Sequence, residues 1–210
     1  MDTATAFALL HCFLLAYLVQ SAPVSLPSNP SPAFSEAAER AKTLVDKILK
    51  EIPTVHSATI STEGLTLDPT SQNANLQMMV ISLGIPAAPV LKPLSERFTL
   101  DMCVSRMSAG SQLYHGLLGV LSEKQSGLKD LQADLRDLQT TINKMKEVAQ
   151  LSDSSADQAH VPYLSRPLDG SYEVQVAVHV TLTQMRSFCH DLMRSLRVVA
   201  PSRPRSAGAQ

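Results

Sequence analysis

Three aspartates on one predicted helix are the side chains whose type and spacing most clearly suggest a function. Asp130, Asp134 and Asp137 are spaced i, i+4 and i+7, which stacks them along one edge of a helix. Like charges at this spacing destabilise a helix by about 0.2–0.5 kcal/mol. Either the aspartates belong to a solvated face beside Lys129 and Arg136, or they form a surface whose carboxylates meet Arg or Lys side chains of a partner protein.

The histidines and cysteines give little support for catalysis or metal binding. No two histidines flank an acid with the spacing of a zinc protease helix, and neither a Gly-rich phosphate loop nor a Gly-x-Ser-x-Gly elbow occurs. Cys189 and His190 are adjacent, so on a helix they point about 100° apart and cannot act as nucleophile and base. We therefore expect no enzyme, no cofactor and no metal site. The histidines beyond residue 22 are His56, His115, His160, His179 and His190.

Two cysteines remain once the N-terminal segment that contains Cys12 is set aside. Cys103 and Cys189 each occupy an apolar position of a predicted helix. They are either two buried free thiols or one disulfide between helices.

Four apolar stripes with helical spacing define the elements that must position these side chains. The gaps between the stripes are roughly 45, 6 and 24 residues, and only a long connection lets the next helix start in the same direction as the last. We therefore predict an all-α, up-up-down-down four-helix bundle with two long crossover loops, the wiring of helical cytokines and growth-hormone-like hormones. The stripes span Phe34–Ile52, Phe98–Leu121, Leu128–Ala149 and Val174–Val199.

The first and last helices each raise a question of boundary or type. Pro53 is expected to end the first helix, because proline lacks an N–H donor and pushes the preceding residue out of the helical region. The connection Thr54–Arg97 is too long to be structureless, so a short extra helix is expected around Leu76 and Val80. The last segment alternates valines with a period of two, as in a strand, but a longer helical stripe and an N-cap at Ser171 favour a helix.

The second helix contains Gly110, Gly116 and Gly119. Each glycine costs about 1 kcal/mol relative to alanine inside a helix. Three of them suggest that this helix approaches a neighbour closely.

Composition and the chain ends predict a soluble, exported protein. Residues 1–22 read as a secretory signal peptide, with a membrane-anchored signal as the alternative; residues 23–33 should form a flexible arm, 34–200 the helical domain and 201–210 a disordered basic tail. Hydrophobic residues make up 44% and aromatic residues 4% of the chain, which suits a helical core of aliphatic side chains. The formal net charge of −1 suggests neither a nucleic-acid partner nor an acidic membrane surface, and we expect no membrane insertion of the mature chain.

Several short motifs resemble the granulocyte colony-stimulating factor family, in the interleukin-6 group of long-chain helical cytokines. The most specific is residues 82–89, Ser-Leu-Gly-Ile-Pro-Ala-Ala-Pro. Weaker matches continue through the later helices and become unclear in the first. They include Cys103, Ser105, Gly110, Leu113, Tyr114, Gly116, Leu117, Leu118, Asp134, Asp137, Thr140, Thr141, Ile142, Met145, Ser187, Phe188, Arg194, Leu196 and Arg197.

The resemblance implies a secreted cytokine, monomeric by itself, that binds and clusters a class I cytokine receptor ectodomain and stimulates granulocyte-lineage cells. Other interleukin-6-group cytokines, and a secreted helical carrier of lipids or small ligands, are the alternatives. In the family, an edge formed by the first and third helices makes the major receptor contact. The positions here that correspond to it, or are candidates for it, are Asp134, Asp137, Glu147, Glu39, Lys42 and Asp46.

Two features of this chain depart from the family. The glutamate of the second receptor edge is replaced at the matching position by Asn75, with Asp68 the nearest preceding acid. Cys103 matches one half-cystine of the family, but its partner would fall at Pro93.

Overall fold

The computed structural model describes residues 31–67, 74–151, 164 and 168–200, which belong to one compact unit beginning at Ser31. Apart from one antiparallel bridge between Ser95 and Phe98, the regular elements among these residues are helices. No helix in this part of the chain is both long and apolar enough to cross a membrane. The helices are α2 (Pro32–Thr59), α3 (Ala74–Leu83), α4 (Leu100–Ser122), α5 (Lys129–Val148) and α6 (Ser171–Val199).

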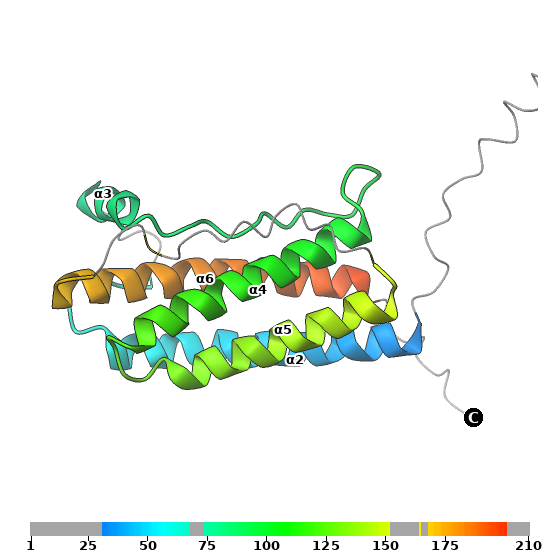
Figure 1. The fold of residues 1–210 in the computed structure, drawn as a ribbon, viewed down its shortest axis with the longest axis horizontal. Coiled ribbons are helices and arrows are strands. Elements are labelled where there is room, and N and C mark those ends of the chain that lie inside the picture. Colours follow the sequence, from blue (N-terminus) through cyan, green and yellow to red (C-terminus); the bar gives the residue numbers. More distant parts are fainter. Residues whose placement is uncertain (1–30, 68–73, 152–163, 165–167, 201–210) are drawn as a thin grey trace, which may run out of the picture. The chain divides into compact units, whose positions relative to one another are not determined.

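The four long helices form the predicted up-up-down-down bundle. In Figure 1, α2 and α4 run in one direction and α5 and α6 in the other. Helix α2 packs against α5 and α6, and α4 packs against the same two helices, so each long helix has two antiparallel neighbours. The short helix α3, which precedes α4 in the first crossover, packs against α6. The fold class expected from the gap lengths is confirmed.

The core is aliphatic, as the composition requires. Each long helix contributes one buried stripe, and Leu117, Leu135 and Leu192 are among many side chains with no exposed surface. Burying each such side chain contributes about 1.5–3 kcal/mol, so this core is the main source of stability.

Helix α2 is longer than expected because Pro53 does not end it. Ser31 caps its start by accepting a hydrogen bond from the Phe34 N–H at 3.2 Å, and the helix continues past Pro53 to Thr59. The prediction that Pro53 stops the first helix was therefore wrong. Pro53 lies on the solvent face, and the turns beyond it bury His56 and Thr59. That burial offsets the hydrogen bond that a proline removes from the helix.

The valine-rich start of α6 is helical, although its alternation resembles a strand. Val174, Val176, Val178 and Val180 are all buried, and so are Ala177, His179 and Thr181, which lie on other sides of the helix. A helix surrounded by α2, α3 and α4 can bury every side, so alternation carries no information about a solvent face here. The N-cap is Gly170 rather than the expected Ser171, which is the first helical residue.

Polar contacts fasten the first crossover to the bundle at both of its ends. The Gln175 side-chain oxygen accepts hydrogen bonds from the backbone N–H groups of Ser61 and Thr62, both at 2.9 Å. Further along, the Arg106 guanidinium donates to the Val90 carbonyl at 2.8 Å and lies 5.2 Å from the ring centre of Phe98. The long connection is thus held against α6 and α4.

Candidate functional site

The edge between α2 and α5 contains an ion-paired cluster centred on Asp134. Its carboxylate oxygen Oδ1 accepts a hydrogen bond from Lys47 Nζ of α2 at 2.7 Å, and Lys47 Nζ also lies 3.6 Å from Glu51 Oε1. Asp134 is 7% exposed, and its second oxygen, Oδ2, is buried with no hydrogen-bond partner among the described residues. One lysine therefore lies between two carboxylates.

The pKa values in this cluster reflect that crowding. The hydrogen bond to Asp134 raises the pKa of Lys47 above its ordinary value. Burial, followed by the neighbouring Asp134 carboxylate, raises the pKa of Glu51, and Lys47 offsets part of that effect. The cluster holds one more negative than positive charge when all three groups are ionised, so a cation from outside would stabilise it.

The three aspartates predicted to lie on one edge do not share one environment. Asp130 and Asp137 are exposed on α5, whereas Asp134 turns toward α2 and is buried. Of the two alternatives, a solvated face therefore describes Asp130 and Asp137 but not Asp134. Glu147, near the end of α5, is exposed.

The candidates on α2 pair locally within their own helix. Lys42 Nζ lies 2.7 Å from Glu39 Oε1, and Lys50 Nζ lies 2.6 Å from Asp46 Oδ2. The residues that reach α5 are instead Lys47 and, through it, Glu51, which the sequence did not single out. Lys47 and Glu51 have the i, i+4 spacing of a helical ion pair, but only the packing of α2 on α5 shows that Lys47 also meets an aspartate 87 positions away.

The structure describes only one of the two residues predicted for a second receptor edge. Asp68 lies outside the described residues, and Asn75 belongs to the first turn of α3. On the same helix, Met78 and Ile81 are 71% and 79% exposed.

Both cysteines are buried free thiols in the structure. Burial raises the pKa of Cys103 to about 11 and that of Cys189 to about 12. Neither thiol is ionised near neutral pH, which leaves both unreactive as nucleophiles. Pro93 and Cys103 line the same cavity of about 240 Å³, at the place where the resemblance would put a disulfide.

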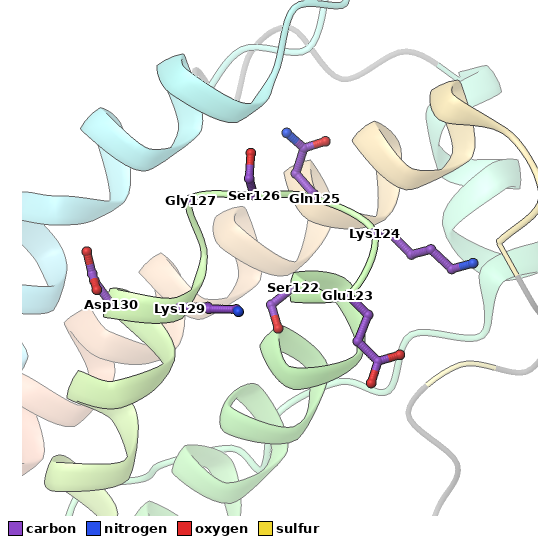
Figure 2. Close-up of a pocket in the computed structure, with 8 residues that line it drawn as sticks. All are labelled: Ser122, Glu123, Lys124, Gln125, Ser126, Gly127, Lys129 and Asp130. Atoms are coloured by element: carbon purple, nitrogen blue, oxygen red, sulfur yellow. The ribbon is translucent and has the colours of Figure 1, made fainter.

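A second cavity, of about 450 Å³, lies at the turn between α4 and α5. It is lined by polar and charged residues, and Figure 2 shows their side chains pointing in different directions rather than converging on one point. A carrier of lipids needs an apolar pocket, which this lining does not provide. Within the described residues, no three His, Cys, Asp or Glu side chains are placed to hold a metal ion. The lining residues are Ser122, Glu123, Lys124, Gln125, Ser126, Gly127, Lys129 and Asp130.

Comparisons with known proteins agree with the fold and with the resemblance. No protein-family model matches the chain. It is 29% identical to granulocyte colony-stimulating factor of Sus scrofa and 30% identical to that of Homo sapiens, in each case over 124 residues, or 57% of this chain. The matched region spans 62% and 58% of those two relatives, which is less than two thirds of their own length. The sequence similarity and the bundle of packed long helices together support a divergent chain that is similar to granulocyte colony-stimulating factor.

Proposed function

We propose that the chain is a secreted cytokine that binds and clusters a class I cytokine receptor through the edge between α2 and α5, and so stimulates granulocyte-lineage cells. The observation that carries the proposal is the similarity to granulocyte colony-stimulating factor in a chain with the up-up-down-down bundle. Secretion would depend on residues 1–22, which read as a signal peptide. The ligand itself would do no chemistry, because its activity is to bring receptor chains together.

The register of α2 against α5 supports the choice of edge. Lys47 meets Asp134, and the two helices are antiparallel, so the part of α2 opposite Asp137 lies before Lys47. Glu39 and Lys42 lie in that part of α2. A partner that contacts the exposed Asp137 would therefore meet these two candidates on the facing helix.

Within this edge, Asp134 and Asp137 would have different roles. Asp134 already binds Lys47 and is buried, so it would hold the two helices in register. Asp137 is exposed and makes no ion pair within the described residues, so it is free to meet an Arg or Lys of the receptor. Charge pairs of this kind at an interface set association rate and specificity.

The test is a charge reversal that spares the core. Asp137→Arg should weaken binding to a granulocyte colony-stimulating factor receptor ectodomain at least about tenfold, measured by surface plasmon resonance, with unchanged far-ultraviolet circular dichroism. Glu96→Arg is the matched control, because Glu96 is an exposed acid in the loop before α4, the helix that does not pack on α2. Equal affinities of the wild-type and Asp137→Arg chains would reject this edge.

Two further measurements address the rest of the proposal. The full chain expressed in animal cells should be recovered from the medium with an N-terminus near Pro23, and it should support proliferation of receptor-bearing granulocyte precursors. Retention of residues 1–22 on a membrane-bound product would contradict secretion. Stoichiometric lipid in the purified protein would favour the carrier instead.

A further inference from the structure

Two buried histidines connect the end of α2 to the beginning of α6. His56 Nε2 and His179 Nδ1 are 2.9 Å apart, and the rings meet edge to face with centroids 5.2 Å apart. His56 is 7% exposed and His179 is 3% exposed. In Figure 1, the end of α2 and the start of α6 lie at the same end of the bundle.

The hydrogen bond between the two rings is favourable only when both rings are neutral. With both rings neutral, one N–H donates to the lone pair of the other ring. A first extra proton places a positive charge in a desolvated site, and a second places two N–H donors against each other across 2.9 Å. Burial lowers the pKa of His56, and burial together with the charge of His56 lowers the pKa of His179 to about 4.

The charged groups around the pair do not counteract this effect. Glu51 lies on α2, Glu63 in the loop that follows it and Glu173 on α6, while α3 carries no charged residue. No carboxylate among the described residues raises the pKa of either ring. The turn between α4 and α5 and the start of α5 carry Glu123, Lys124, Lys129 and Asp130.

The part of α2 that carries His56 follows a break in the hydrogen bonding of the helix. Pro53 has no N–H, so the hydrogen bond that would join this turn to the preceding one is absent. Beyond Pro53, the His56–His179 contact and the hydrogen bonds from Ser61 and Thr62 to Gln175 hold the chain against α6. Of these contacts, only the histidine pair contains groups whose ordinary pKa lies between pH 5 and 8.

We propose that the His56–His179 pair is an acid-sensitive latch that fastens the last turns of α2 to α6 at neutral pH and releases them in mildly acidic medium. A released histidine takes up a proton at its ordinary pKa of about 6.5, whereas the closed pair does so only at lower pH. The closed form is therefore fully stable above about pH 6.5 and loses stability as the pH falls below that value. This inference depends on the bundle and not on the proposed receptor.

The test compares the purified wild-type chain with the double variant His56→Gln/His179→Asn. The glutamine amide replaces Nε2 and the asparagine amide replaces Nδ1, so a neutral hydrogen bond remains but no group titrates. Between pH 7.5 and 5.0, the thermal unfolding midpoint of the wild-type chain should fall at least about 4 °C more than that of the double variant. His190→Gln, which removes an exposed histidine of α6, should behave like the wild-type chain.

Hydrogen exchange shows whether the opening is local. After correction for the intrinsic pH dependence of exchange, peptides covering 53–62 and 171–180 should lose protection at pH 5.0 in the wild-type chain, while a peptide covering 112–122 keeps it. Equal pH dependence of midpoint in the wild-type chain and the double variant would overturn the proposal, as would loss of protection spread evenly over the bundle.

A direct titration keeps the proposal testable if the double variant does not fold. Imidazole nitrogen shifts of the wild-type chain, followed by NMR, should show two rings whose pKa values lie below the ordinary histidine value. Titration of every ring near the ordinary value would overturn the latch. A rise in the midpoint on adding Zn²⁺ at pH 7.5, absent in the double variant, would also overturn it by making the pair a metal site.

Discussion

Gly110 on α4 lies directly against the ring of Phe188 on α6. A Cβ atom at residue 110 would come within 2.4 Å of the ring atoms Cε2 and Cζ. The Phe188 ring also packs with Tyr114, one turn further along α4, with the ring centroids 5.5 Å apart. The close approach that the glycines of this helix suggested is therefore real at position 110, and it fixes how deeply α6 sits against α4.

Gly110→Ala should destabilise the bundle even though alanine favours helix. The clash with a rigid ring costs about 1–3 kcal/mol, which offsets the gain of about 1 kcal/mol in helix propensity. We expect a lower free energy of unfolding in urea. Gly119→Ala is the control, because its Cβ would meet only the end of the flexible Gln132 side chain, at 2.9 Å. A stability of Gly110→Ala equal to or above that of Gly119→Ala would contradict this packing.

Lys47→Met should lower the thermal midpoint by several degrees. The change leaves the buried Asp134 carboxylate without its partner, and an unpaired buried charge costs more than a surface ion pair contributes. Lys50→Met is the matched control, since Lys50 and Asp46 are both exposed. Adding Asp134→Asn to Lys47→Met should restore most of the loss, and failure to do so would show that the lysine acts through packing.

Glu51→Gln should raise the midpoint at pH 7 by about 1–2 °C, as expected for a partly exposed charge. The folded protein holds the pKa of Glu51 above its ordinary value, so ionisation disfavours the folded state as the pH rises above about 4.5. The benefit of the amide should therefore be present at pH 7 and disappear near pH 4. Glu36→Gln, which removes an exposed acid of the same helix, is the matched control.

Pro53→Ala should stabilise α2. Alanine restores the missing N–H donor inside the helix at an exposed position, which we expect to raise the free energy of unfolding by about 1–2 kcal/mol. Pro89→Ala, in the first crossover, should instead lower the free energy of unfolding by about 0.4–1 kcal/mol, because alanine gives the unfolded chain more conformational entropy to lose on folding. Hydrogen exchange at residues 54–59 should slow in Pro53→Ala, and unchanged exchange there would contradict a weak point at Pro53.

The two thiols should resist modification in the folded protein. Burial keeps Cys103 and Cys189 protonated, so a disulfide-exchange reagent at pH 8 should label them only after denaturant is added. Absorbance at the wavelength of the released thiolate measures both rates. Labelling as fast as that of an unfolded control would show that the two helices open readily.

The sequence by itself determined the number of long helices, their order and their directions. Apolar spacing marks a buried stripe wherever one face of a helix meets a core, and connection lengths limit which neighbours can be antiparallel. Both signals depend on residues that are close in the sequence, so they can be interpreted without knowing which helices pack against each other. The period-two alternation at the start of α6 was misleading when taken alone, because burial surrounds that helix, and the expected stop at Pro53 was wrong because burial of the following turns outweighs the local preference.

Only the tertiary structure decided which polar side chains meet. The sequence placed Asp130, Asp134 and Asp137 on one helix edge. In the structure, the register of α2 on α5 pairs Asp134 with Lys47, whereas Asp130 and Asp137 are exposed to solvent. In the same way, His56 and His179 look like scattered histidines until α2 and α6 bring them 2.9 Å apart. A contact across 87 or 123 positions depends on how two helices rotate and slide against each other, and no local pattern encodes that.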